Sequence, residues 1–318
     1  RSALGQVAPA GEAPPRRLTR SAAGEAGGAA FLPDGTLLFT SSRPDPDVKP
    51  DPDRTVHALW ALPPDGGEAR LLVAPDGGVD GVEVARSAPV VAFGAGMFPG
   101  AADFAADAER AKARREAGVG ALLFEDDYPI RYWDHWLAPR RRRLFAATMA
   151  ADPEAPLPTP RDLQPDVETA SFEDAGFAVA PDGSFVVAAR ADLGSPPRIR
   201  GDLVVFDLAT GAARVLTPGD ADYHQPAVAP DGRTVAALRT AHGTPREAER
   251  PVSRGEGGSC PDARGGARPL AGAPALGAGR HGDLLHGRRL GPPSRLPPGP
   301  RGRPGHAADR RGGALRPL

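Results

Sequence analysis

The sequence predicts an all-β fold: a partial β-propeller of about five four-stranded blades over residues 25–250, with one helical excursion and a disordered C-terminal tail. Two observations predict it: the tripeptide Pro-Asp-Gly recurs along the chain, and the chain aligns with itself without gaps. Four short strands with their turns need about 40–50 residues, which is the length of one propeller blade. The abundance of Gly and Pro (40 and 38 residues) suits such a turn-rich fold.

The Pro-Asp-Gly tripeptide marks predicted hairpin turns. It occurs at residues 33–35, 64–66, 75–77, 181–183 and 230–232. Three copies lie in a shared context: "FLPDGTLLFTSSR", "VAPDGSFVVAAR" and "VAPDGRTVAALR". Proline presets the first turn dihedral, aspartate bonds back to the backbone, and glycine takes positive φ. Each of these three turns is therefore predicted to join two strands of one blade.

The gapless internal alignment sets the expected blade length. At an offset of 144, residues 61–74 match 205–218 and residues 82–93 match 226–237. An offset of 144 equals three periods of 48, and the step from Asp182 to Asp231 is 49. The predicted blade runs from "LVVFDL" through the turn "ATG" to "ARVLT", then to "PAVA", the turn "PDG" and "TVAALR". Helical repeats fit less well because these segments lack a 3.6-residue period.

A helical excursion is predicted inside the repeat region, at residues 103–117. The stretch "DFAADAERAKARREA" has helical composition, with Asp103 or Asp107 as N-cap and Gly118 just past the C-terminus. The segment "VGALLFE" is expected to return as a strand. Arg140 to Arg143 are expected to form a solvated turn before the strand "LFAAT"; the alternative is a surface for an acidic partner.

The aromatic stretch "YPIRYWDHWL" follows the predicted helix. Asp134 and His135 suggest a catalytic couple, but neighbours in a strand point to opposite faces, and such couples are assembled from separate loops. We therefore expect an aromatic anchor where the excursion rejoins the propeller. The candidates for substrate or partner contact are Arg131, Tyr132, Trp133, His135 and Trp136.

Charge divides the chain near residue 250. Residues 251–318 contain 12 Arg, no Lys and four acidic residues, so their net charge is about +8, against about −9 for residues 1–250. The C-terminal stretch has no Phe, Trp, Tyr or Ile and is predicted to be disordered. It is either a basic arm for a polyanion or GC-rich DNA translated out of frame. The absence of lysine and aromatics favours the second hypothesis.

Several kinds of site are not expected. The single cysteine, Cys260, rules out an intramolecular disulfide and a cysteine-rich zinc site, and it suits a cytoplasmic location. The histidines His57, His224 and His242 show no ligand spacing, so no metal or cofactor is expected. No apolar run long enough to span a membrane occurs. Because Arg1 is not Met, we expect residues 1–24, which include a candidate first strand, to begin after a lost N-terminus.

The repeats and the excursion carry a family resemblance. "APDGRTVAALR" and "DLATGAARVLTPG" resemble repeats in the propellers of TolB-like proteins and of prolyl oligopeptidase-family serine peptidases. "AERAKARREAGVGALLFEDDYPIRYWDHWL" resembles an insertion of the acylaminoacyl-peptidase-like members. The resemblance implies a propeller that caps a C-terminal α/β-hydrolase domain and filters peptide substrates.

The chain departs from that family at its catalytic motif. The family's nucleophile lies on a G-x-S-x-G elbow, and the nearest match, residues 257–261, ends in proline. No catalytic residue is therefore carried over, and we expect a truncated, inactive chain whose partners are the missing hydrolase domain and peptides, not membranes or nucleic acid. The alternatives are a TolB-like or WD-repeat-like protein-binding module and, less favoured, a nucleic-acid binder with a basic tail.

Overall fold

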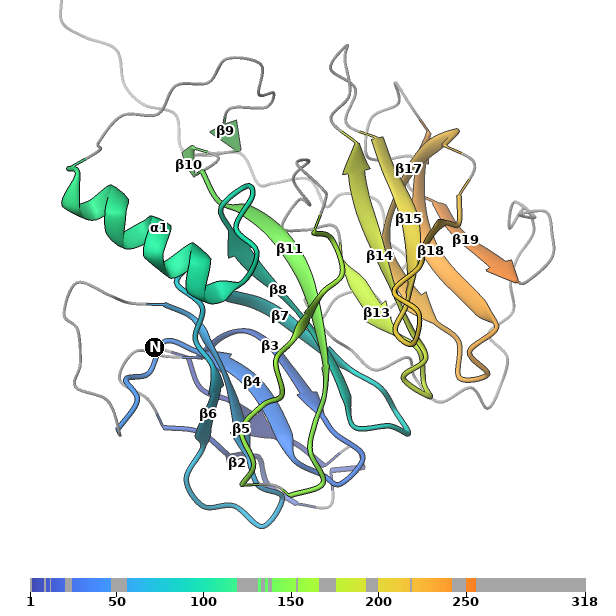
Figure 1. Ribbon diagram of the computed structural model, residues 1–318. Helices are drawn as coiled ribbons and strands as arrows, with labels where there is room; N and C mark the ends of the chain where they lie inside the picture. Colours follow the sequence, from blue (N-terminus) through green and yellow to red (C-terminus); the bar gives the residue numbers. More distant parts are fainter. Residues whose placement is uncertain are drawn as a thin grey trace, which may run out of the picture. The chain divides into compact units, whose positions relative to one another are not determined.

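Successive antiparallel sheets, each built from a continuous region of the chain, form the protein (Figure 1). This computed structural model describes residues 2–8, 10–11, 13–20, 25–46, 56–118, 131–132, 135–136, 139–152, 154–165, 176–192, 200–217, 219–241 and 250–255. All of them belong to one compact unit, which spans residues 1–280. Sequential pairing of neighbouring strands is the arrangement expected of propeller blades.

Three sheets contain four strands each, paired in the order of the chain. The first consists of β3 (Glu25–Phe31), β4 (Leu37–Ser41), β5 (Ala58–Leu62) and β6 (Arg70–Val73). The second consists of β7 (Val79–Val84), β8 (Val90–Met97), β11 (Arg141–Thr148) and β12 (Arg161–Asp162). The third consists of β13 (Phe177–Val179), β14 (Phe185–Asp192), β15 (Arg200–Asp207) and β16 (Ala213–Val215).

The fourth sheet has three described strands: β17 (Ala221–Val228), β18 (Thr234–Ala241) and β19 (Arg250–Gly255). The predicted fold class, all-β with four-stranded propeller sheets, is confirmed. Within the described residues there are four large sheets instead of the expected five or so. The difference arises because the second sheet extends from residue 79 to residue 162 and takes in the whole excursion.

Three Pro-Asp-Gly turns lie where they were predicted, between the first and second strands of the first, third and fourth sheets. Their glycines, Gly35, Gly183 and Gly232, have φ of 90°, 75° and 71°. Their aspartates accept a hydrogen bond from the backbone N–H two residues later, at 2.8 Å for Asp34 and 2.9 Å for Asp231. The turn chemistry is therefore local and repeats from sheet to sheet.

The predicted start of each blade was wrong by two strands. "LVVFD" is the third strand of its sheet and "ARV" the fourth, whereas "ADYHQPAV" begins the next sheet. The internal alignment is correct strand for strand, because β5 to β8 correspond to β15 to β18. Its offset of 144 spans two sheets, not three periods of 48, since the second sheet includes residues 98–140 between β8 and β11.

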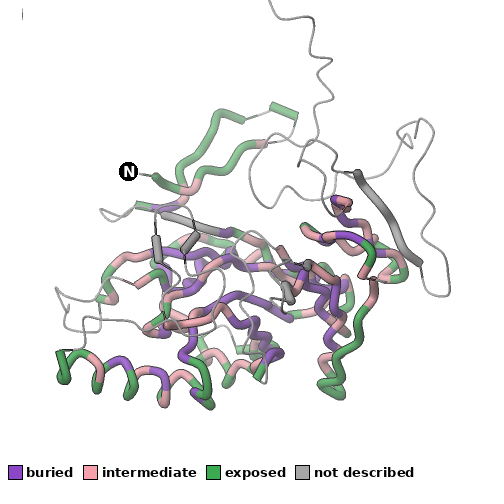
Figure 2. Tube along the Cα trace, turned by 90° about the horizontal axis from the view of Figure 1, so that it is seen from above, coloured by how far each residue is buried: buried purple, intermediate pink, exposed green. Residues whose placement is uncertain are grey.

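Hydrophobic clusters fill the spaces between consecutive sheets. One joins the first and second sheets around Leu38, Val91 and Phe93, and another joins the second and third around Ala92 and Val186. Both faces of β8 are therefore buried, which explains its nearly continuous apolar sequence "VVAFGAGM". Buried segments run through the middle of the sheets in Figure 2, where α1 instead alternates between buried and exposed residues.

The N-terminal segment covers the outer face of the first sheet. It forms a short antiparallel pair, β1 (Gly5–Gln6) with β2 (Arg16–Arg17). Leu4 and Leu18 pack against a cluster that contains Phe39 and Trp60. Trp60 is 1% exposed, and its indole N–H donates to the Ser41 carbonyl oxygen at 3.2 Å. The segment thus shields an apolar face that would otherwise be in water.

The C-terminal boundary differs from the one drawn from composition. Strand β19 runs from Arg250 to Gly255 and pairs with β18, so it crosses the predicted boundary at residue 250. The rest of the predicted disordered tail, residues 256–318, lies outside the described residues. Within the described part of the chain, no helix is long and apolar enough to cross a membrane.

The two ends of the sheets carry different connections (Figure 1). Strands one and two are joined at one end by tight turns, which include the three Pro-Asp-Gly turns. Strand two ends and strand three begins at the other end, which we call the connection end; in sequence, residues 42–57, 98–140, 193–199 and 242–249 lie between them. The helix and the aromatic stretch belong to the second of these connections, so the connection end is where a functional site is best sought.

Candidate functional site

The helical excursion begins and ends as predicted. Helix α1 spans Phe104–Glu116, and the Asp103 side chain accepts a hydrogen bond from the Ala106 N–H at 2.7 Å. Gly118, with φ of 62°, follows the helix. Of the two predicted N-cap candidates, Asp103 is therefore the cap. Asp107 lies inside the first turn, fully buried, where its carboxylate accepts the Phe98 N–H at 2.7 Å.

The four consecutive arginines do not form the predicted solvated turn. Arg141, Arg142 and Arg143 are the first residues of β11, which pairs with β8 from Arg141 opposite Met97 to Thr148 opposite Val90. The side chains of Arg142 and Arg143 are only 10% and 4% exposed. Composition predicted solvent-exposed charge here, but carboxylates and backbone carbonyl groups from distant parts of the chain accept hydrogen bonds from these guanidinium groups.

Arg143 is the most buried member of this arginine cluster, which we define as Arg140, Arg142 and Arg143. Its Nη1 donates to the Ala101 carbonyl oxygen at 2.9 Å and to Asp162 Oδ2 at 3.0 Å. Its Nη2 donates to the Phe98 carbonyl oxygen at 3.3 Å. One guanidinium therefore holds the start of the excursion against β11 and β12.

Arg142 links the first strand of the second sheet to the third sheet. Its Nε lies 2.7 and 2.8 Å from the two carboxylate oxygens of Asp80, and its guanidinium lies 5.5 Å from the centre of the Phe177 ring. A Cβ at Gly94 would lie 2.0 Å from Asp80 Oδ1 and 2.7 Å from Arg142 Nε. Glycine at this position in β8 leaves the space that the ion pair occupies.

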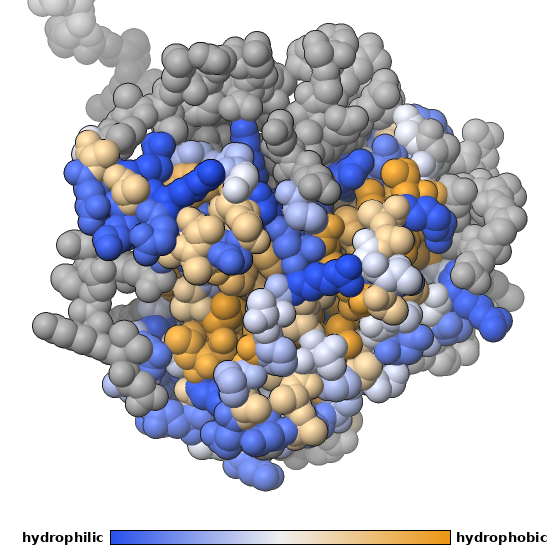
Figure 3. Space-filling view, in the orientation of Figure 1, coloured by the Kyte–Doolittle hydropathy of each residue, from blue (hydrophilic) through white to orange (hydrophobic). Residues whose placement is uncertain are grey.

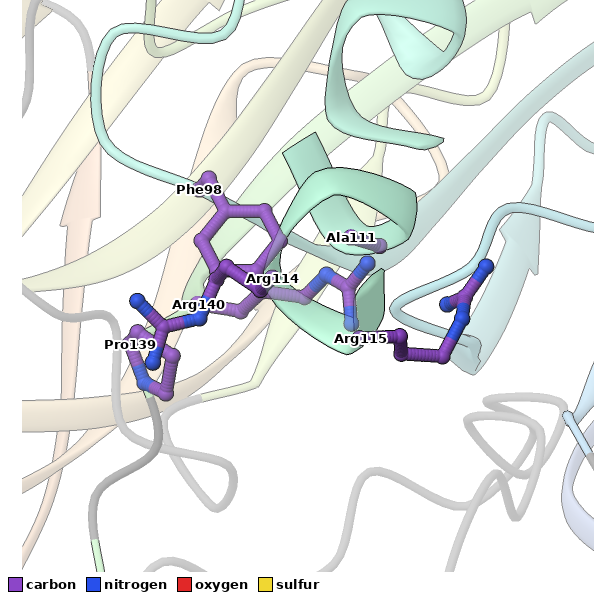
Figure 4. Close-up of a pocket in the computed structure, with 6 residues that line it drawn as sticks. All are labelled: Phe98, Ala111, Arg114, Arg115, Pro139 and Arg140. Carbon is purple, nitrogen blue, oxygen red and sulfur yellow. The ribbon is translucent and has the colours of Figure 1, made fainter. Parts of the chain in front are cut away.

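Arg140 pairs with Asp107 and covers an aromatic ring. Its Nε donates to Asp107 at 3.0 Å, and its guanidinium lies 4.4 Å from the centre of the Phe98 ring. Its Nη2 is 2.9 Å from Asp107 Oδ2, an ion-pair contact whose angle does not make a hydrogen bond. Beside this pair lies an open pocket of about 280 Å³, lined by Phe98, Ala111, Arg114, Arg115, Pro139 and Arg140 (Figure 4).

The aromatic stretch forms a small hairpin within the same connection. Strand β9 (Arg131–Tyr132) pairs antiparallel with β10 (His135–Trp136), so Tyr132 lies opposite His135 and Arg131 opposite Trp136. Trp133 and Asp134 lie outside the described residues, as does the expected strand "VGALLFE". The contact role of the five candidate residues in this stretch stays a prediction.

A second polar cluster lies at the connection end of the fourth sheet. The Tyr223 hydroxyl donates to Asp220 Oδ1 at 2.6 Å, and Arg239 Nη2 donates to Asp220 Oδ2 at 3.0 Å. Burial and the neighbouring carboxylate raise the pKa of Tyr223 to about 12, and the hydrogen bond from Tyr223 lowers the pKa of Asp220. At neutral pH the tyrosine therefore stays protonated, which suits a structural donor better than an acid or base.

Chemically, the described residues at the connection end are suited to binding. They offer guanidinium groups and aromatic rings, and no group of three His, Cys, Asp or Glu side chains in the described part of the chain could hold a metal ion. His224, expected on a loop, lies within β17. Hydrophilic side chains gather over α1 on the face shown in Figure 3.

From the sequence, Arg140 to Arg143 were expected as a solvated turn or a surface for an acidic partner, and no polar cluster around Tyr223 was expected. Asp80 and Arg142 are 62 residues apart, and Arg143 and Asp162 are 19 apart, so no local motif joins them. One sequence signal pointed to the burial of the arginines. The apolar segment "LFAAT" follows them directly, so the predicted strand could have been extended to include Arg141 to Arg143.

Comparisons with known proteins give structural similarity without a family assignment. No family model matches the chain, and no curated protein matches it. The fold is similar to TolB from Acinetobacter baumannii, with 12% identity and a TM-score of 0.47 over 80% of this chain and 46% of that one. It is also similar to a putative TolB from Agrobacterium tumefaciens, with 13% identity and a TM-score of 0.49 over 82% of this chain and 73% of that one.

A peptidase is among the similar structures. The acylaminoacyl peptidase of Pyrococcus horikoshii has 12% identity and a TM-score of 0.45, over 71% of this chain and 30% of that one. The chain thus spans under half the length of the Acinetobacter TolB and under a third of this peptidase.

Proposed function

We propose that this chain is a non-catalytic propeller module that controls the access of peptides to the hydrolase domain of a serine peptidase. The observation that carries the proposal is the unequal distribution of connections. The helix, the β9–β10 hairpin and the arginine cluster all belong to, or border, one long connection at one end of the sheets. Long connections on a rigid scaffold are where binding surfaces are usually found.

The sequence of that connection adds the peptide-related part of the proposal. It includes "YPIRYWDHWL", the segment that resembles the insertion of acylaminoacyl-peptidase-like proteins. The arginines that follow this segment in the sequence are held in fixed positions, because Arg140, Arg142 and Arg143 each have a carboxylate partner. A gating module needs such fixed contacts and no nucleophile of its own.

The partners follow from this role. One is a hydrolase domain, which supplies the serine nucleophile and transfers the acyl group of a peptide bond to that serine and then to water. The other is the peptide that passes the propeller. Both belong to the whole enzyme, of which this chain would be the filtering part.

Labelling with a fluorophosphonate tests the proposal. The purified 318-residue chain should show no serine-directed label and no peptide hydrolysis. The gene should be sequenced beyond codon 318 in every frame, and any hydrolase domain found there should be expressed together with the propeller. That product should be labelled and should cleave short peptides but not folded proteins.

Two outcomes would contradict the proposal. Labelling of the purified chain itself would show that the chain is catalytic. Neighbouring DNA without any hydrolase sequence would favour the alternative, a protein-binding module comparable to TolB.

A further inference from the structure

The open pocket at the C-terminal half of α1 joins both ends of the helical connection. Phe98 comes from the residue after β8, Ala111, Arg114 and Arg115 come from the helix, and the Pro139–Arg140 pair comes from the residues before β11. Figure 4 shows the Phe98 ring beside Arg114 and Arg140, with Pro139 next to Arg140 and Arg115 further along the helix. The pocket is therefore built from elements that the buried Asp107 already holds in place.

The positive charge of the pocket is only partly balanced. Arg140 is neutralised by Asp107, whose side chain is 1% exposed. Arg115 lies 3.7 Å from Asp76, with 66% of its own side chain exposed, so this pair is loose. Among the residues that the structure describes, Arg114 has no carboxylate partner, and its guanidinium lies 5.9 Å from the centre of the Phe98 ring. At least one cation in the pocket is therefore available to a ligand.

The positive charge of the pocket is opposite in sign to the net charge of residues 1–250, which contain 27 basic and 36 acidic residues. An exposed guanidinium fork binds a carboxylate through two parallel hydrogen bonds. Phe98 and Pro139 add an apolar floor for the methylene groups next to such a carboxylate.

We propose that this pocket binds the carboxylate of an acidic peptide, with Arg114 as the principal contact and Arg115 as the second. A volume of about 280 Å³ suits one side chain or one chain terminus. The carboxylate comes either from a glutamate side chain or from a free C-terminus. The inference does not require a peptidase role, since a protein-binding module would use the same pocket for an acidic segment of its partner.

Fluorescence anisotropy of the full chain with three labelled peptides tests the proposal. The first is otherwise neutral, with one glutamate and a free C-terminus, the second has glutamine in place of glutamate, and the third keeps glutamate but has an amidated C-terminus. Weaker binding of the second peptide assigns the pocket to a side-chain carboxylate, and weaker binding of the third assigns it to the terminus. Equal binding of all three overturns the proposal.

Variants of α1 then place the site. We expect Arg114→Gln to weaken binding of the preferred peptide about tenfold, and Arg115→Gln several-fold, because charge-assisted hydrogen bonds are lost. Lys112→Gln is the matched control, since Lys112 is exposed on the same helix, carries the same charge and does not line the pocket. Circular dichroism confirms that each variant is folded.

The outcomes separate a specific pocket from general attraction. Equal weakening by Lys112→Gln and Arg114→Gln overturns the proposal, because it shows attraction by net charge alone. Tighter binding of a labelled single-stranded oligonucleotide, lost in Arg114→Gln, overturns it in favour of a phosphate ligand.

Discussion

The two ends of the sheets are stabilised in different ways. At the turn end, each Pro-Asp-Gly turn is complete within a few residues: Asp231 accepts from Arg233 N at 2.9 Å, and Gly232 supplies the positive φ. At the connection end, the contacts join distant residues, as between Arg142 and Asp80 or between Arg143 and Asp162. The turn end repeats from sheet to sheet, whereas the described ion pairs of the second sheet are built around its own insertion.

This contrast shows how an insertion is held on a repeated scaffold. The aspartate hydrogen bond and the positive-φ glycine of each turn lie within a few residues, so they can be copied with each sheet. The turn at residues 181–183 adds a long-range contact, because Ser87 donates to its Pro181 carbonyl oxygen. An insertion between strands two and three must instead be fastened, and here the fastening uses guanidinium groups that reach several backbone and carboxylate oxygens at once. We expect substitutions at the connection end to cost more stability than comparable substitutions at the turn end.

The largest effect is expected for Arg143→Met. This change removes the hydrogen bonds to the Ala101 and Phe98 carbonyl oxygens and leaves Asp162 without its cation. Removing one partner of a buried pair typically costs about 3–5 kcal/mol. The measurement is the free energy of unfolding in urea.

Arg233→Met is the matched control at the turn end. The Arg233 side chain is exposed and its contact with Asp231 uses only the backbone N–H, so the change should be within about 0.5 kcal/mol. If Arg143→Met and Arg233→Met lowered the free energy of unfolding equally, the proposed difference in stability between the turn end and the connection end would be wrong.

Gly94→Ala tests the connection end of the second sheet through packing. The added Cβ would lie 2.0 Å from Asp80 Oδ1 and 2.7 Å from Arg142 Nε, so the ion pair must move. We expect a loss of about 2–3 kcal/mol, within the range for overpacked sites. Urea unfolding measures it, and the double variant Gly94→Ala with Asp80→Ala should lose less than the sum of the two single variants. Strict additivity would show that the glycine does not serve the ion pair.

The same contrast explains how much the sequence could predict. The Pro-Asp-Gly turns, the N-cap Asp103 and the strand equivalence at offset 144 all depend on residues close in sequence or on repetition, and they were predicted correctly. The phase of the blades, the burial of Arg143 and the role of Asp107 depend on which distant strands meet. Sequence periodicity does not show which distant strands meet, so the run of arginines is predicted as a solvated turn.

Gly232→Ala probes the turn end alone. Gly232 has φ of 71°, and its added Cβ would come no closer than 3.9 Å to any neighbour, so only the backbone conformation is strained. A non-glycine residue in the left-handed region costs about 1 kcal/mol. Gly232→Asn should restore part of the loss, because asparagine tolerates that region better. Thermal unfolding compares the two, and an asparagine variant less stable than the alanine variant would contradict this account.

The smallest effect, at the connection end of the fourth sheet, depends on pH. Tyr223→Phe removes the 2.6 Å hydrogen bond to Asp220 and should cost about 0.5–1 kcal/mol at pH 7. Folding raises the pKa of Tyr223 from 10.0 to about 12, so the contribution of its proton is fully present below pH 10 and is lost as pH rises toward 12. The difference in unfolding free energy between wild type and variant should therefore shrink between about pH 10 and pH 12. A difference that stays constant over this range would contradict this account, because it would mean that folding does not raise the pKa of Tyr223.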